Sequence, residues 1–276
     1  MQTSTLIEQF EKELRFKKYR EQSILNYLSC VTKFLYSFKE KDSIKHINES
    51  DIKSFLMQFK EHNTQRAYHS AIKCFYHYVA HQPDKFKYIE YAKRNRKLPI
   101  VHSQDEIQRL LDACTNLKHK AIICTMYATG CRVGEIINLK LSDIDSSRMI
   151  INVRNAKGGK DRQVVLPQKL LDLLRTYFIQ YKPKDFLFEG QSSPQYSSRS
   201  IAQFLNHYSD KAGLKKRIYP HLLRHDAFTH LLEGGVELSI IQKLAGHQSI
   251  KTTQGYCQIS NSLISKIQSP LNQIRL

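Results

Sequence analysis

The sequence lacks any apolar run long enough to cross a bilayer, which argues against an integral membrane protein. Its first residues, MQTSTLIEQFEKEL, also lack the basic start and apolar middle of a secretion signal. We therefore expect a cytoplasmic protein. With 276 residues, 41% of them hydrophobic, the chain can build one large domain or two ordinary ones.

Cysteine patterns that hold metals or disulfides are also missing. The six cysteines include no CxxC pair, and most lie among apolar residues with helical spacing, at positions 30, 74, 114, 124, 131 and 257. We interpret them as buried, reduced thiols rather than a disulfide framework. Acidic residues near the reactive stretches, such as Glu135 and Asp161, are scattered among basic ones. The sequence therefore predicts neither a metal nor another cofactor.

Negative charge is scarce throughout the chain, and the formal net charge is +18. Residues 1–97 contain 19 Lys and Arg against 11 Asp and Glu, and residues 98–276 contain 24 against 14. Positive charge spread in this way attracts a long polyanion, because neutralised phosphates release condensed counterions. The pattern favours a nucleic-acid-binding protein over a merely basic one.

Helical periodicity dominates the first third of the sequence. Apolar residues recur at helical spacing after Ser23, after Ser50 and from about Thr64, which predicts a helical domain over 1–91 with those serines as candidate N-caps. The stretch 92–101 then carries four cations before Pro99, and we interpret it as a basic interdomain linker.

The remainder, 102–276, reads as a mixed domain. Ser103 and Glu106 form a capping-box pattern, and an apolar helix ends near Gly130. The β-branched runs of SDIDSSRMIINVRNAKGGKDRQVVLP predict a small antiparallel sheet. Pro220 opens a further helix. The predicted fold is mainly α with a small antiparallel β-sheet, in two domains.

The stretch HLLRH places His221, Arg224 and His225 on one helix face. It is not a metalloprotease zinc helix, because Leu222 stands where that motif needs glutamate. An arginine and a histidine on one helix face suit the binding of a phosphate better than the binding of a metal ion.

Two further cations are candidates for the same phosphate. Arg132 begins a short helix, whose N-terminus would add backbone donors for an anion. A salt bridge from Arg132 to Glu135 is an equally good interpretation. Lys157, in NAKGGKDR, lies at the predicted turn between two strands, where it could reach an oxygen or simply face solvent.

These residues would give Tyr256 a chemical task. Two arginines could hold a phosphodiester and neutralise a pentavalent transition state. His221 and His247 could manage protons, and Lys157 could protonate the departing sugar oxygen. Tyr256 could then attack phosphorus and form a covalent phosphotyrosine. The protein–DNA bond would retain the energy of the phosphodiester, so rejoining would need neither ATP nor a metal.

Four motifs, taken in order, resemble the tyrosine recombinases and integrases, especially the short Xer-like members. They are ATGCRVGEIINLKLSDID, NAKGGKDRQVVLP, HLLRHDAFTHLL and LAGHQSIKTTQGY. The resemblance implies that the catalytic set is Arg132, Lys157, His221, Arg224, His247 and the nucleophile Tyr256. It implies supporting roles for Glu135 and His225.

The resemblance further implies a core DNA-binding domain in 1–91 and a catalytic domain in 102–276. The family forms a C-shaped clamp on duplex DNA at a specific recombination site. A homotetramer there exchanges strands through a 3′-phosphotyrosine intermediate and a Holliday junction, in some cases with a partner recombinase or an accessory protein. Residues 259–276 could dock on a neighbour or pack on their own domain. The chain is too short for an additional arm-binding domain.

The stretch 226–229 departs from the family pattern, because it reads Asp-Ala-Phe-Thr where relatives often have a small residue followed by Phe-Ala-Thr. Asp226 stands beside the active-site helix, where it could face solvent, pair with a cation, or oppose phosphate binding if it pointed inward. Two alternatives share the scaffold: a type IB topoisomerase-like nicking-closing enzyme and a non-catalytic DNA-binding protein. An RNA-binding protein would be supported by charge alone.

Overall fold

The computed structural model describes residues 3–91, 100–154, 161–191, 193–246 and 253. The chain divides into two compact units, Met1–Lys97 and Leu98–Leu276. This division falls within the stretch 92–101 that the sequence suggests as a linker, most of which lies outside the described residues. The two units are described separately.

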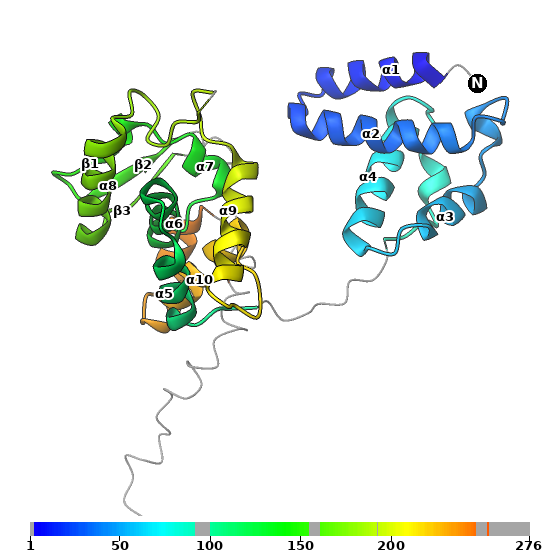
Figure 1. Ribbon diagram of the computed structural model, residues 1–276. Coiled ribbons are helices and arrows are strands. Elements are labelled where there is room, and N and C mark those ends of the chain that lie inside the picture. Colours follow the sequence, from blue (N-terminus) through cyan, green and yellow to red (C-terminus); the bar gives the residue numbers. More distant parts are fainter. Residues whose placement is uncertain (1–2, 92–99, 155–160, 192, 247–252, 254–276) are drawn as a thin grey trace, which may run out of the picture. The chain divides into compact units, whose positions relative to one another are not determined.

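The N-terminal unit is helical, and its long helices α1 and α2 lie side by side (Figure 1). Aromatic rings fill its core: Phe10 meets Phe75 edge to face at 5.6 Å between centroids, and Phe34 meets Phe55 at 5.2 Å. Its elements are α1 (Thr3–Phe16), α2 (Glu21–Ser37), η1 (Ile44–His46), α3 (Glu49–Met57), α4 (His62–Tyr78) and η2 (Pro83–Phe86).

Both predicted N-caps in this unit are wrong by two or more residues. Helix α2 already begins at Glu21, so Ser23 lies inside its first turn. Helix α3 is capped by Asn48, whose side chain accepts from the Asp51 N–H at 2.9 Å while the Asp51 carboxylate accepts from the Asn48 N–H at 2.8 Å. This reciprocal arrangement satisfies two backbone donors, which Ser50 could not do from within the helix.

The C-terminal unit combines helices with one small sheet, as the sequence predicts. Strands β1, β2 and β3 are consecutive and antiparallel, with Ile151 opposite Val164 in the β2–β3 pair. The elements are α5 (Gln104–Ala113), α6 (Leu117–Thr129), α7 (Val133–Ile137), η3 (Leu141–Asp143), β1 (Ile144–Asp145), β2 (Ile150–Val153), β3 (Arg162–Val165), α8 (Gln168–Tyr181), α9 (Ser198–Lys211), α10 (Pro220–Glu233) and α11 (Leu238–Ala245).

Helix α6 lies at the centre of this unit. It packs on α8, β3 and α10, and Figure 1 shows α8 and the sheet on one side of it and α9 on the other. None of its residues is exposed, which is why its sequence shows little helical amphipathicity. It ends, as predicted, at Gly130, where φ is +60°.

Two other terminus predictions are confirmed in this unit. Ser103 accepts from the Glu106 N–H at 3.1 Å and Glu106 accepts from the Ser103 N–H at 2.9 Å, which completes the predicted capping box of α5. Pro220 occupies the first turn of α10, where its missing N–H costs no hydrogen bond.

The described cysteines are all free thiols. Cys114 and Cys131 are buried, whereas Cys30, Cys74 and Cys124 are half-buried. Burial raises the pKa of Cys74 and of Cys124 to about 11, so both stay protonated at neutral pH. Cys257 lies outside the described residues. Among the residues that the structure describes, no helix combines the length and apolar character of a membrane span.

Candidate active site

Among the arginines and lysines of the C-terminal unit that the structure describes, Arg224 is the most deeply buried, with 2% of its surface exposed. Its guanidinium donates to the carbonyl oxygens of Gly130 and Ala245, the latter at 2.6 Å, and stacks 4.8 Å from the centroid of Phe228. These contacts join α10 to the ends of α6 and α11. A buried arginine fixed on two backbone carbonyls has little freedom of orientation, which suits a preorganised donor.

Arg132 lies just before α7 and pairs with Glu135. Its Nη1 donates to Glu135 Oε1 at 2.9 Å, and its main-chain N–H donates to Oε2 at 2.8 Å. The salt bridge considered in the sequence analysis therefore exists. Glu135 occupies the Arg132 N–H, so this particular backbone donor is already used within the protein. The Arg132 side chain remains 30% exposed, so its guanidinium is open to a ligand as well.

Arg162 on β3 is a third cation that sequence reasoning missed. Its Nη1 and Nη2 donate to the two oxygens of Glu135 at 2.9 and 2.7 Å, and its Nε donates to the Leu244 carbonyl at 2.7 Å. The side chain is only 9% exposed. The sequence did carry a signal for it. Arg162 and Val164 are two residues apart in the predicted strand, so alternation places the arginine on the same face as a buried residue.

Glu135 is thus held by two arginines from separate elements. Burial alone would raise the pKa of Glu135, but the hydrogen bonds from Arg162 and from the Arg132 N–H outweigh it, and the pKa falls to about 2. The carboxylate is therefore charged at any physiological pH. Its negative charge offsets part of the local positive charge and fixes Arg132 relative to β3.

His221 and His225 project from neighbouring turns of α10, with ring centroids 5.3 Å apart. Partial burial lowers the pKa of His221, and the charges of Arg224 and Arg132 lower it further. Burial likewise lowers the pKa of His225, followed by the nearby His221. Both imidazoles are therefore neutral near pH 7, and each has one N–H that can donate a hydrogen bond to a phosphate oxygen.

The described part of the site thus gathers five of the predicted residues from two stretches of the sequence. The set comprises Arg132, Glu135, His221, Arg224 and His225. Lys157, His247 and Tyr256 lie outside the described residues. The strands β2 and β3 that flank Lys157 in sequence do pair as predicted. Helix α11 ends two residues before His247, and Thr253, between His247 and Tyr256, is buried.

The Asp226 carboxylate pairs with His102. It is fully buried and accepts hydrogen bonds from the main-chain N–H of His102 at 3.1 Å and from His102 Nδ1 at 3.0 Å. Of the three possibilities left open by the sequence, pairing with a cation is therefore the one observed, with a histidine as the partner.

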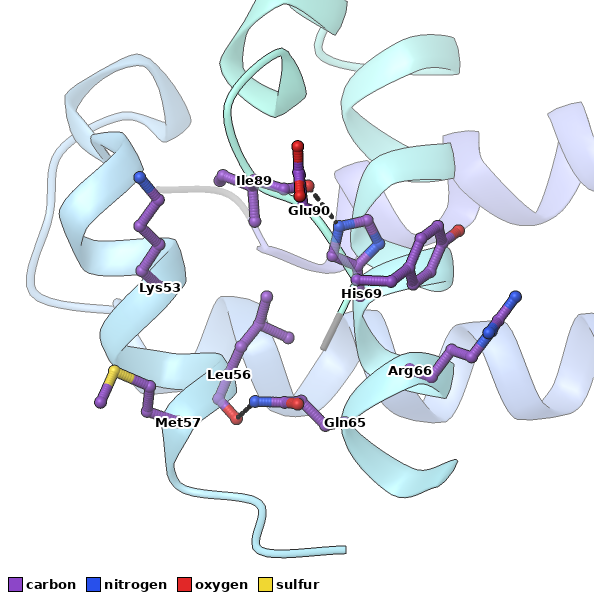
Figure 2. A pocket seen from close by; sticks show the side chains of 9 residues that line it. Lys53, Leu56, Met57, Gln65, Arg66, His69, Ile89 and Glu90 are labelled. Atoms are coloured by element: carbon purple, nitrogen blue, oxygen red, sulfur yellow. Dashed lines mark hydrogen bonds between the residues drawn. The ribbon is translucent and has the colours of Figure 1, made fainter. Parts of the chain in front are cut away.

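Each of the two units also contains a hollow. One, of about 570 Å³, is lined by Arg162 and by residues at the open ends of β2 and β3: Asn152, Arg154, Asp161 and Gln163. The other belongs to the N-terminal unit and measures about 230 Å³. Figure 2 shows Lys53 and Arg66 on opposite sides of it, with the His69 ring bonded to the Ile89 carbonyl at 2.7 Å.

Family models match most of the chain. The model described as the phage integrase family covers residues 101–262, and the phage integrase N-terminal SAM-like domain covers residues 6–85. The two matches fall on the two compact units described above. The first alone spans more than half of the sequence.

Curated relatives agree with the family models. The tyrosine recombinase XerD of Oceanobacillus iheyensis is 31% identical over 280 residues, covering 93% of this chain and 94% of its own. The tyrosine recombinase XerA of Pyrococcus furiosus is 29% identical over 267 residues, covering 93% and 90%. The similarity therefore extends over nearly the whole length of each protein.

Solved structures share the fold. The crystal structure of XerA recombinase aligns with a TM-score of 0.58 at 29% identity, covering 96% of this chain and 97% of that one. XerH bound to its difH substrate in a pre-cleavage complex aligns with a TM-score of 0.74 at 22% identity, covering 96% and 84%. The chain therefore belongs to the phage integrase family and is a Xer-like, tyrosine-type site-specific recombinase.

Proposed function

We propose that this recombinase cleaves and rejoins duplex DNA through a covalent bond between Tyr256 and a 3′-phosphate. The observation that carries this assignment is the position of Arg224, buried and bonded to two backbone carbonyls, close enough to Arg132 for both charges to act on His221. Two fixed guanidiniums beside neutral histidines form a cradle for a phosphodiester.

In the proposed cleavage step, the Tyr256 oxygen forms a bond to phosphorus while the bond from phosphorus to the 5′-oxygen breaks. The tyrosine proton passes to a histidine, His221 or His247, and Lys157 donates a proton to the departing 5′-oxygen. Arg132 and Arg224 stabilise the negative charge on the non-bridging oxygens. Rejoining reverses these steps with a 5′-hydroxyl, so the residues consume no ATP.

DNA is the substrate that the charge of the chain favours. Both units carry excess Lys and Arg, which suits contact with phosphates on both sides of a site. We therefore assign residues 1–91 to core DNA binding, 92–101 to a linker and 102–276 to catalysis. We also assign residues 259–276 to docking between protomers. Action on DNA agrees with the cytoplasmic location expected from the sequence.

Assembly is proposed by analogy with the structural relatives. A lambda integrase tetramer bound to a Holliday junction aligns with a TM-score of 0.76 at 17% identity, covering 92% of this chain and 76% of that one. We propose that this chain likewise acts as a homotetramer on two copies of a specific site and exchanges strands in pairs. A partner recombinase or an accessory protein would join this assembly at some sites.

The test is covalent trapping on a cognate site. The Tyr256→Phe protein selects bound duplexes from a random library, and the recovered site is then nicked close to the cleavage position so that rejoining fails. The wild-type protein should form a complex that survives denaturing electrophoresis, and Tyr256→Phe should bind without forming it. Failure of the wild type to trap on that verified site would leave only a DNA-binding function.

A second measurement separates recombination from a type IB topoisomerase-like activity. Plasmids with two copies of the site, in direct or inverted repeat, should yield excision or inversion products. A plasmid without the site should keep its supercoils. Relaxation of the site-free plasmid with no recombinant product would instead identify a nicking-closing enzyme.

A further inference from the structure

His102 and Asp226 form a buried contact outside the phosphate-binding group. Their side chains are 1% and 0% exposed. His102 immediately precedes the N-cap of α5, near the start of the C-terminal unit, whereas Asp226 lies on α10 two residues after Arg224. The contact therefore joins the segment just before α5 to helix α10, which carries Arg224 and His221.

The hydrogen bonds define the protonation state of His102. Its Nδ1 lies 3.0 Å from Asp226 Oδ2, and its Nε2 lies 3.0 Å from the Lys216 carbonyl oxygen. A carbonyl oxygen and a carboxylate can only accept, so both ring nitrogens must donate. The geometry thus requires an imidazolium paired with a carboxylate, which also accepts from the His102 main-chain N–H at 3.1 Å.

The neighbouring groups fit the same assignment. His230 Nε2 lies 2.8 Å from the His102 carbonyl oxygen, so this nitrogen donates. In a neutral His230, Nδ1 accepts from the Tyr127 hydroxyl, which lies 2.7 Å away. A neutral His230 therefore satisfies both of its contacts, and the positive charge of the network resides on His102.

The groups facing this pair come from several elements. Glu106 of α5 and Asp226 of α10 act on His102 as negative charges, and both favour its protonated form. The Lys216 side chain is exposed, and only its carbonyl contacts the ring. His225 of α10 is close enough to sense Asp226 but is itself driven toward the neutral form by burial. The negative charges of Asp226 and Glu106 therefore favour the protonated form of His102.

We propose that His102 and Asp226 are a positioning pair for DNA cleavage. When His102 is protonated, the pair holds α10, and with it Arg224 and His221, against the segment just before α5 at the start of the catalytic unit. The inference rests on the proposed function for its catalytic readout. Because a displacement of about 1 Å at a reacting group can cost on the order of 100-fold in rate, a small shift of α10 would be sufficient to impair cleavage.

The pair predicts a direction of pH dependence. Burial alone would lower the pKa of His102, but the hydrogen bonds to Asp226 and to the Lys216 carbonyl outweigh it, so the pKa is raised. The stabilising contribution is therefore complete below the unfolded value of about 6.5 and is lost as the pH rises through the raised value in the folded protein. Above the raised pKa, one unprotonated ring nitrogen of His102 would face the Asp226 carboxylate or the Lys216 carbonyl oxygen, and both of these groups can only accept.

Asp226→Asn gives a variant with the opposite dependence. The asparagine oxygen can accept from the His102 main-chain N–H, and its amide can donate to an unprotonated Nδ1, while Nε2–H still donates to Lys216. A neutral His102 then satisfies every contact, and protonation as the pH falls would disrupt them. Asp210→Asn is the matched control, because Asp210 pairs with Arg217 at 2.8 Å on the surface of the same unit.

The experiment measures single-turnover formation of the covalent complex from about pH 6 to about pH 10, a range that spans the titration of His102. Wild type and Asp210→Asn should lose activity together on the alkaline side, whereas Asp226→Asn should retain it there and lose it toward acid. Asp226→Ala should cleave on the order of 10- to 100-fold more slowly, with DNA affinity little changed. Parallel profiles for wild type and Asp226→Asn would overturn the proposal.

Two readouts do not depend on cleavage and so separate this inference from the proposed function. Thermal unfolding of the full chain should show the midpoint of Asp226→Asn falling below that of the wild type at acid pH and approaching or exceeding it at alkaline pH. Nitrogen-15 NMR of the imidazoles should show His102 with both nitrogens protonated at neutral pH. A singly protonated His102 in the wild type would refute the pair even if cleavage proceeds as expected.

Discussion

Arg162 and Glu135 form a two-pronged ion pair, in which Nη1 donates to Oε1 at 2.9 Å and Nη2 donates to Oε2 at 2.7 Å. The side chains are 9% and 7% exposed. Arg132 shares the same carboxylate. A buried carboxylate between two arginines stabilises the fold only while all partners are present, because a lone buried charge is costly.

Glu135→Gln should destabilise the protein by about 3 kcal/mol at neutral pH, because it removes the charged partner of a buried arginine. Because the pKa of Glu135 is lowered, its contribution is present above the unfolded value of about 4.3 and is lost as the pH falls toward about 2. Urea unfolding at several pH values measures this difference. A stability gap that stays constant down to pH about 2 would contradict the assignment.

Arg162→Lys tests the geometry of the pair rather than its charge. Lysine keeps a positive charge near Glu135 but cannot donate to both of its oxygens and to the Leu244 carbonyl in the same fork. We expect a loss of about 1–3 kcal/mol in unfolding free energy and slower covalent trapping. Arg175→Lys is the control, because Arg175 forms only an exposed contact with Asp172.

Arg132→Ala should slow cleavage on the order of 100-fold or more while leaving DNA affinity much less affected, because removal of one preorganised donor typically costs about 3 kcal/mol in the transition state. Single-turnover trapping and equilibrium binding separate the two effects. Arg224→Lys is the companion variant, since alanine there would also leave the carbonyls of Gly130 and Ala245 without their donor. An unchanged trapping rate would remove the altered residue from the proposed site.

Gly130→Ala should destabilise the C-terminal unit through packing and backbone conformation together. An added Cβ would lie 2.4 Å from Phe228 Cζ, and the φ of +60° is unfavourable for alanine. We expect a cost of about 2–4 kcal/mol from overpacking and the left-handed backbone. Gly213→Ala is a suitable control, because Gly213 has a similar φ of +63° with open space around its Cβ position. Equal melting temperatures for the two variants would show that the contact with Phe228 adds nothing to the cost of Gly130→Ala.

Local rules predicted much of this architecture from the sequence. The capping box at Ser103, the end of α6 at Gly130 and the start of α10 at Pro220 each depend on residues within one turn. The short antiparallel sheet follows from β-branched runs between turn residues. Ser50 misled the prediction because Asn48 caps α3 two residues earlier, and Ser23 misled it because α2 begins at Glu21 without any capping side chain.

Contacts between distant segments could not be predicted in the same way. Arg162 is 27 residues from Glu135 and 82 from Leu244, and only the folded chain brings them together. Asp226 and His102 are 124 residues apart, so the sequence showed an unexpected aspartate without its partner. The motifs identified Arg132, His221 and Arg224 as candidates, whereas the support that fixes their orientation arises from packing.

The end of α11 has a consequence for the nucleophile. The carbonyls of Leu244 and Ala245 accept hydrogen bonds from Arg162 and Arg224, so the last residues of α11 are tied to both arginines. Nine residues lie between Gly246 and Tyr256, and the ten Cα–Cα steps that join these two residues span at most about 35 Å. Because the end of α11 is tied to the arginines, this chain length also limits how far the backbone of the proposed nucleophile can lie from them.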